Sequence, residues 1–292
     1  MTQALGWPTE YRQLDAGCFS STFANLESES WFLMEEQSSR RVEVEAPAPS
    51  GMYVLALVEG DTAAVNGQTL SSDHIFVQGP DSELRATLPA GIKVTQMGIG
   101  GEHFEDVILR VAPALLVPRG GVNLVATAPG VLAGLRQAMR EALLAPSHRE
   151  AAREEAISRI LSDAVGVMAD HVDVPLGRDL HRAPARRALD RARHYIEAHL
   201  GETIRVASIC RHAGTTLRSL ERIFAREMGI SPQKYVKARR LNAARRRFLA
   251  ANEERLSVTE VALEHGFDHL GRFAGDYRHY FGESPRETLL RQ

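Results

Sequence analysis

The chain has 292 residues, which is enough for two domains of ordinary size. Its 44% apolar and 25% charged residues are typical of a soluble globular protein and exclude a disordered chain. Residues 185–292 carry 21 Lys and Arg against 13 Asp and Glu, a net charge of +8, whereas the remainder carries 14 against 24, a net charge of −10. This division indicates that the C-terminal third meets phosphates and the rest does not.

Neither a secretory leader nor a transmembrane stretch is apparent in the sequence. The two cysteines, Cys18 and Cys210, lie far apart along the chain, and we interpret both as small packing residues without a redox role. We therefore expect a reduced, cytoplasmic protein that does not enter a membrane.

Residues 41–100 are predicted to form the strands of a small antiparallel β domain, within a β-rich part that covers 1–120. Residues 1–40 contain apolar side chains without a clear period. Met52–Val58 is a continuous apolar run of strand length, and Asn66-Gly67 is a hairpin signal. Further short strands are expected at 42–44, 74–77, 84–88 and 92–96. A short helix is expected within 103–117, and the run from Pro113 to Pro118 is expected to add one more strand.

Residues 130–171 carry two apolar stripes at helical spacing and predict an antiparallel helical hairpin. Two interpretations of these stripes stay equally open: they pack on the β domain, or they form a dimer interface. Residues 172–186 contain two prolines and one glycine without an apolar period, so we predict a linker there.

Residues 187–292 are predicted to be helical and to contain two helix-turn-helix units, at 204–228 and 258–281. In the first unit Gly214 ends one helix and Thr216 caps the next, and in the second unit Gly266 takes the place of Gly214. A long basic helix joins the units; Ser231-Pro232 marks its start, and it runs to about residue 250. Two such units in tandem are a much more specific signal than one.

The residues of this region resemble the DNA-binding domain of the AraC/XylS family of bacterial transcriptional regulators. The segment 261–267 is similar to the family's Ile-Ala-x-x-x-Gly-Phe, and the residues around 273–285 are similar to its Phe-x-x-x-Phe/Tyr-x-x-x-Phe-Gly-x-Ser/Thr-Pro ending. The resemblance covers about residues 186–292. It implies a two-domain α+β protein with a cupin-like β domain and helical hairpin (1–171), a linker (172–186) and an all-α domain with two helix-turn-helix motifs (187–292).

The resemblance also implies function. It implies a sequence-specific regulator of transcription, by family habit an activator, which binds double-stranded DNA, contacts RNA polymerase, dimerises through 130–171 and responds to a small-molecule effector. The effector-contacting residues cannot be identified without the strand register. The alternative is a regulator without an effector, whose N-terminal domain dimerises or binds a protein partner.

The candidate DNA-binding residues lie on the outer faces of the predicted recognition helices and on the connecting helix. Arginine donates two hydrogen bonds to guanine in the major groove, so Arg218 and Arg222 are the leading base contacts, with Glu221 accepting from a cytosine amino group or ordering an arginine. We expect the second unit to read few bases and to contact phosphates mostly through Arg272, Arg278 and His279. Lys234 and Lys237 on the connecting helix are further predicted phosphate contacts. The full set of predicted DNA-binding residues is Thr216, Arg218, Ser219, Glu221, Arg222, Lys234, Lys237, His269, Arg272, Arg278 and His279.

An enzyme is the remaining class, and the sequence disfavours it. A cupin metal site needs about three closely placed ligands, whereas residues 1–120 contain His74 and His103 with Glu102 and Glu105 beside the latter. The glycines at 98, 100 and 101 do not form a dinucleotide or P-loop pattern. We therefore predict no catalytic residues, no metal and no cofactor.

Overall fold

The computed structural model describes residues 9–115, 117, 121–145, 150–171, 183–250 and 256–290. These residues fold into two compact units. The first, the β unit, contains the described residues of 1–10, 21–38 and 44–178, and the second, the helical unit, contains those of 11–20, 39–43 and 179–292. The prediction of a β-rich N-terminal part followed by a helical C-terminal part is confirmed.

The strands form two sheets. A six-stranded sheet has the order β11-β8-β5-β10-β3-β2, and a five-stranded sheet has the order β1-β4-β9-β6-β7. The strands are β1 (Glu10–Gln13), β2 (Ser21–Glu27), β3 (Trp31–Ser38), β4 (Val42–Pro47), β5 (Met52–Glu59), β6 (Ala63–Val65), β7 (Gln68–Leu70), β8 (His74–Gln78), β9 (Glu83–Leu88), β10 (Lys93–Gly100) and β11 (Val122–Ala126).

The central strands of the six-stranded sheet are buried on both faces, which explains the continuous apolar run of β5. Leu55 and Met97, which are partners across β5 and β10, belong to the core shared with the helices of this unit. Their neighbours Val54 and Phe32 lie on the opposite face and pack in a second cluster with Met34 and Ala46.

Two local predictions meet different outcomes in the β unit. The Asn66-Gly67 hairpin is confirmed, because both residues have positive φ and join β6 to β7 with Val65 opposite Gln68. The strand predicted at 113–118 is wrong over residues 113–115, which follow a helix without entering a sheet, while 116 and 118 lie outside the described residues. β8 pairs with β5 on one side, and the strand on its other side is β11, further along the chain.

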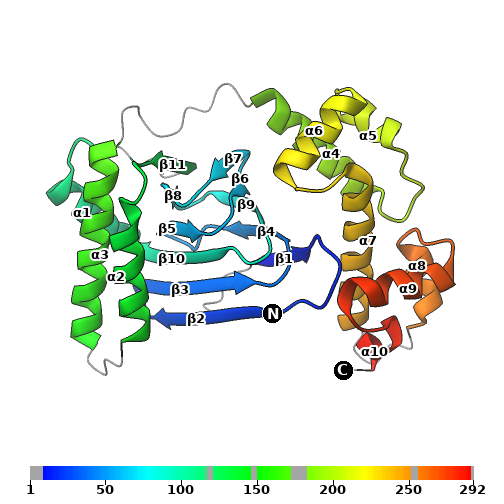
Figure 1. Ribbon diagram of the computed structural model, residues 1–292, viewed down its shortest axis with the longest axis horizontal. Helices are drawn as coiled ribbons and strands as arrows, with labels where there is room; N and C mark the ends of the chain where they lie inside the picture. Colours follow the sequence, from blue (N-terminus) through cyan, green and yellow to red (C-terminus); the bar gives the residue numbers. More distant parts are fainter. Residues whose placement is uncertain are drawn as a thin grey trace. The chain divides into compact units, whose positions relative to one another are not determined.

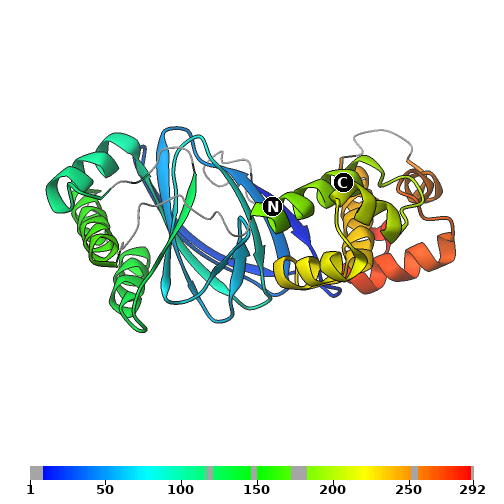
Figure 2. The ribbon, with the colours of Figure 1, turned by 90° about the horizontal axis from the view of Figure 1, so that it is seen from above.

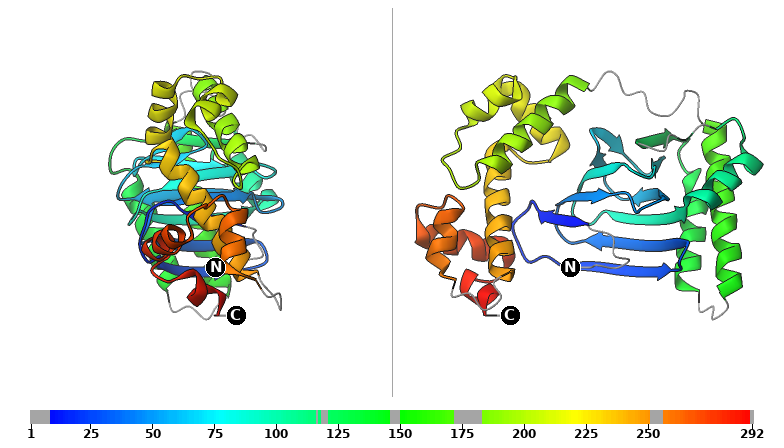
Figure 3. Two further views of the ribbon diagram at one scale, coloured as in Figure 1. Left: turned by 90° about the vertical axis from the view of Figure 1, so that its right-hand side faces the viewer. Right: turned by 180° about the vertical axis from the view of Figure 1, so that it is seen from behind.

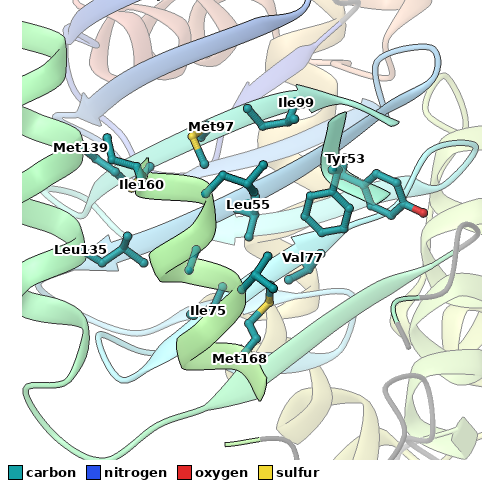
Figure 4. Packing of buried hydrophobic residues seen from close by; sticks show 14 of the residues in the cluster. Tyr53, Leu55, Ile75, Val77, Met97, Ile99, Leu135, Met139, Ile160 and Met168 are labelled. Atoms are coloured by element: carbon teal, nitrogen blue, oxygen red, sulfur yellow. The ribbon is translucent and has the colours of Figure 1, made fainter. Parts of the chain in front are cut away.

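Three helices cover one face of the six-stranded sheet: α1 (Gly101–Val111), α2 (Leu132–Leu144) and α3 (Glu150–His171). Figure 4 shows Leu135, Met139, Ile160 and Met168 pointing toward the apolar side chains of the sheet. The apolar stripes of α2 and α3 are thus used within the β unit, as the first of the two interpretations predicts. Arg140 also ties α2 to the sheet through Glu35 at 2.8 Å.

The helical unit contains the remaining helices, with α7 running between two smaller groups (Figure 3). One group is α4 (Ala183–Ala198), α5 (Val206–Ala213) and α6 (Leu217–Glu227); the other is α8 (Val258–Glu264), α9 (Leu270–Phe281) and α10 (Pro285–Leu289). The connecting helix α7 (Pro232–Leu249) starts with the predicted Ser231 cap and Pro232. One apolar core, including Phe224, Tyr235 and Tyr277, joins all of these helices.

Two short N-terminal segments, 11–20 and 39–43, belong to the helical unit, although they lie far from its helices in the sequence. Leu14 is buried in the core of the helices, and the backbone of Gln13 exchanges hydrogen bonds with the Asn242 side chain on α7, at 3.2 and 2.8 Å. Most of the predicted linker lies outside the described residues, and α4 begins at Ala183.

Candidate nucleic-acid interface

The turn between α5 and α6 has the two features that the sequence predicts. Gly214 ends α5 with a left-handed φ of 64°, and the Thr216 hydroxyl accepts a hydrogen bond from the Ser219 amide at 3.3 Å. Leu220 and Phe224 are buried in the core and define the inner face of α6. The opposite face of α6 is therefore left to the solvent.

The outer face of α6 carries the predicted base-reading residues. Arg218, Glu221 and Arg222 are all exposed. Across the described residues, neither Arg218 nor Arg222 forms an ion pair or a side-chain hydrogen bond with another group. They lie four residues apart and so project from the same side of the helix. Ser219 differs, because its hydroxyl accepts from Thr216 at 3.1 Å and so supports the cap.

The second pair, α8 and α9, is built by the same local rules. Ser257 and Glu260 form a capping box at the start of α8, and Gly266 follows this helix with a φ of 72°. Phe273 and Tyr277 bury one face of α9. The glycine turn predicted from the sequence is thus present here too.

We expect Gly266→Ala to destabilise the protein by at least about 1–2 kcal/mol, because a left-handed residue with a Cβ costs that much. A Cβ there would also lie 2.9 Å from the Leu200 carbonyl oxygen. Denaturant unfolding of the full chain measures the effect. Gly275→Ala is the matched control: it lies within α9 with no neighbouring atom inside 4 Å of its Cβ position, so it should stabilise by about 0.5–1 kcal/mol. Equal stabilities for the two variants would contradict the prediction.

The outer face of α9 offers fewer polar groups than that of α6. Gly271 and Gly275 leave open space where side chains would stand. Arg272 and Lys237 both approach Asp276, at 3.9 and 2.8 Å. His269 precedes the helix without a side-chain cap bond. Arg278 and His279 are exposed in the last turn, which is where the sequence predicts phosphate contacts.

Several arginines of α7 form ion pairs or hydrogen bonds with other groups of the protein. Arg239 is buried and forms ion pairs with Glu43, at 2.7 Å, and with Glu197. Arg240 donates hydrogen bonds to backbone carbonyls, including that of Gly266 at 3.0 Å, and Arg245 pairs with Glu283 at 2.6 Å. The charge of this helix is therefore a poor measure of its affinity for phosphate.

Lys234 differs from these arginines. Its side chain is exposed near the start of α7, and its backbone amide donates to the Ser231 cap at 3.4 Å. Of the two lysines predicted to contact phosphate, Lys234 is the one whose ammonium has no ion pair with a described residue.

Comparison with known proteins agrees with this geometry. Residues 209–291 match a family described as a helix-turn-helix domain. The XylDLEGF operon transcriptional activator 1 of Pseudomonas putida is 33% identical over 146 residues, which are 49% of this chain and 44% of that protein. A solved structure, that of a probable AraC family transcriptional regulator from Rhodopseudomonas palustris CGA009, is 36% identical, with 36% of this chain and 95% of that chain covered and a TM-score of 0.33. The chain belongs to the AraC/XylS family of transcriptional regulators.

A further relative of this AraC/XylS-family chain is the probable thc operon regulatory protein of Rhodococcus erythropolis. It is 41% identical over 95 residues, which are 32% of this chain and 29% of that protein. The chain thus spans less than half the length of the two operon regulators. The resemblance inferred from the sequence is confirmed at the level of the family.

A buried ionic cluster links segments of the helical unit, and no local pattern in the sequence indicates it. Glu43, which is 1% exposed, accepts hydrogen bonds from the Tyr235 hydroxyl at 2.9 Å and from Arg239 at 2.7 Å. Arg193 and Arg12 also face its carboxylate, at 2.7 and 3.6 Å. Burial, and secondarily the Glu43 charge, raises the pKa of Tyr235, so this hydroxyl keeps its proton.

The histidines considered for a metal site are each engaged in local contacts. His74 Nδ1 lies 2.8 Å from the Ser71 hydroxyl, and burial lowers the pKa of this histidine. His103 Nε2 lies 3.2 Å from the Ser158 hydroxyl. Within the part of the chain that the structure describes, no group of three or more His, Cys, Asp or Glu side chains could hold a metal ion. Over the same residues, none of the helices combines the length and apolarity that a membrane crossing requires.

Proposed function

We propose that this AraC/XylS-family chain is a sequence-specific DNA-binding regulator of transcription and not an enzyme. The observation that carries the proposal is the outer face of α6, where Arg218 and Arg222 are exposed and without an ionic partner among the described residues. An unpaired guanidinium on a recognition helix is the group that reads guanine O6 and N7 in the major groove. The pairs α5–α6 and α8–α9 then act as two helix-turn-helix heads.

The remaining predicted residues take supporting roles in this proposal. Glu221 accepts from a cytosine amino group or orients an arginine. Thr216 and Lys234 lie near helix starts and contact phosphates, joined by Lys237, Arg272, Arg278 and His279, while His269 lies at the groove edge. Because α7 holds the heads at a set distance and successive major grooves lie about 34 Å apart, the DNA bends to meet both.

The test of DNA binding is selection of duplexes from a random pool by the full chain. We expect one enriched sequence, whose affinity falls steeply with salt as phosphate counterions are released. Failure to enrich any sequence would contradict the proposal. Binding with equal affinity to all duplexes would reduce the protein to a nonspecific DNA binder.

The β unit is proposed to be the cupin-like sensor and dimerisation domain. We propose that a small-molecule effector binds there and shifts the chain between two states that differ in DNA occupancy or in contact with RNA polymerase, with activation as the result. Because the apolar stripes of α2 and α3 pack on the sheet, a homodimer through 130–171 would use the outer faces of these helices. We propose that the protein regulates transcription in the cytoplasm.

We expect an effector at 100 times its dissociation constant to stabilise the protein by about 2.7 kcal/mol, which raises the unfolding midpoint by several degrees. A thermal-shift screen against small metabolites, aromatic acids and amines included, measures this. The full chain is the right sample, because a fragment cut at the linker would separate residues 11–20 and 39–43 from the helices they pack with. No shift across a broad library would favour the alternative, a regulator whose N-terminal domain only dimerises or binds a protein partner.

A further inference from the structure

The two helix-turn-helix heads meet each other through their backbones. The loop between α4 and α5 leads into the first head, and a Cβ at Gly201 in this loop would lie 2.6 Å from the Glu264 carbonyl oxygen at the end of α8. A Cβ at Gly266, in the second head, would lie 2.9 Å from the Leu200 carbonyl oxygen. Each glycine thus faces a carbonyl of the other side too closely for a side chain. We call this reciprocal contact the glycine seam.

Arg240 on α7 bridges the two sides of the glycine seam. Its guanidinium donates one hydrogen bond to the Gly266 carbonyl, at 3.0 Å, and another to the Glu202 carbonyl. The donors of a guanidinium form a rigid planar fork, so two carbonyls bound to it are held at a set position relative to each other. Arg240 therefore ties the loop before α5 to the turn after α8, and both of them to α7.

The first head contains an arginine with half of this role. Arg191 on α4 donates hydrogen bonds at 3.2 and 2.6 Å to the Ala213 carbonyl, directly before the turn glycine Gly214. In both heads an arginine from the preceding helix thus clamps the glycine turn. Arg191 stays within its own head, whereas Arg240 also reaches the other head. This additional bond, together with the glycine seam, carries the inference.

A second connection between the heads changes what α7 can do. A single helix fixes the distance between two heads, but each head can still rotate about its junction with that helix. A contact to one side of the helix closes a loop of connections and removes this rotation. Two heads that are already oriented lose less conformational freedom when both bind, and their affinity rises accordingly.

We propose that Arg240 and the glycine seam form a positioning device, which sets the mutual orientation of the two heads so that both bind one DNA molecule at once. The proposal rests on the DNA-binding function proposed above. Arg240 acts in it through the heads and not by contact with DNA, because its donors are directed to carbonyls of the protein.

The test compares the Kd of the full chain for two duplexes that contain the selected sequence. We expect its footprint on this sequence to have two parts, and the part that changes in Arg222→Ala belongs to the first head. The long duplex contains both parts, and the short duplex ends after the first-head part. The Kd for the short duplex divided by the Kd for the long duplex then measures what the second head adds.

Arg240→Ala should raise the Kd for the long duplex about tenfold and leave the Kd for the short duplex unchanged, so the ratio falls about tenfold. This change corresponds to about 1.4 kcal/mol of ordering that DNA binding must then supply. Gly201→Ala should have the same effect by a different route, because the added methyl group forces the seam apart. Gly201 is not among the glycines with positive φ, so alanine brings no backbone strain of its own there.

Two further variants are controls. Arg191→Ala removes the turn clamp of the first head but no bond between the heads, so it should weaken binding to both duplexes equally and keep the ratio. Gly166→Ala adds a methyl group on α3 with no neighbouring atom within 4 Å of the Cβ position, so it should change neither Kd. Hydrogen exchange of α9 peptides checks that the second head stays folded in Arg240→Ala and Gly201→Ala.

The inference is overturned if either Arg240→Ala or Gly201→Ala keeps the parent ratio, or if Arg191→Ala lowers the ratio as much as they do. Loss of protection throughout α9 in both variants would show that they only unfold the second head, and would overturn it as well. A parent chain that selects no sequence, or protects one part of it alone, contradicts the proposed function with two heads instead. The two failures are therefore distinct.

Discussion

Glu43→Ala is expected to lower the free energy of unfolding of the helical unit by about 3–5 kcal/mol, because removing one partner leaves buried charges uncompensated. The carboxylate faces Arg12, Arg193 and Arg239, whose side chains are all at most one-tenth exposed. It also accepts the hydrogen bond of the buried Tyr235 hydroxyl, which would lose its acceptor. The buried Glu43 carboxylate, with four donors around it, links residues from the N-terminal segment, α4 and α7.

The chain has two units, so the effect must be read from the helical unit itself. Hydrogen exchange of peptides from α4, α6 and α7 reports this unit separately, and we expect their protection to fall by the same free energy. Glu155→Ala is the matched control, since Glu155 forms an exposed ion pair with Arg159 on α3, and it should leave protection in both units unchanged. Unchanged protection in the Glu43 variant would show that the arginines find other partners or water.

The second large effect is expected on DNA. Arg222→Ala should weaken binding to the selected sequence by about 1–3 kcal/mol, roughly 5- to 150-fold in Kd, and should relax the preference at one base pair. Arg218→Ala should do the same at a different base pair. The physical reason is the bidentate pairing of a guanidinium with guanine, which neither an alanine nor a water molecule reproduces.

Two controls separate base reading from simple charge. Arg222→Lys keeps the positive charge but loses the bidentate geometry, so it should recover binding to random DNA without recovering the base preference. Arg110→Ala removes an exposed arginine that pairs with Asp106 on α1, outside the helical unit, and should change neither affinity. Equal weakening of specific and random DNA in Arg222→Ala would instead identify a phosphate contact.

Helix ends and the β-hairpin turn could be predicted from the sequence, because the signals for them are local. Gly214 and Gly266 end helices in the left-handed region, and Thr216 caps α6 with its own hydroxyl, all within a few residues of sequence. The same holds for the Asn66-Gly67 turn. The strands β1, β2 and β3 could not be predicted, because the apolar residues of 1–40 show no clear period in the sequence.

The choice among the charged residues of the candidate site could not be predicted in this way. The sequence predicts Lys234, Lys237 and Arg272 equally as phosphate contacts. In the structure Lys237 and Arg272 form ion pairs with Asp276. Ion pairs form between residues distant in the chain, and a charged side chain has the same appearance in a sequence whether its partner is a phosphate or a carboxylate.

The family, the order of a β-rich part and a helical part, and the exposed face of α6 follow from local sequence signals, since periodicity, caps and turn glycines act over short distances. Which basic side chains are exposed and which are buried in ion pairs depends instead on how the helices pack. Arg239 is the sharpest example: it lies on a helix studded with basic residues, yet its partner Glu43 stands 196 positions earlier in the chain. Such a pairing leaves no periodic trace, because it depends on how distant segments pack and on the cost of burying an unpaired charge.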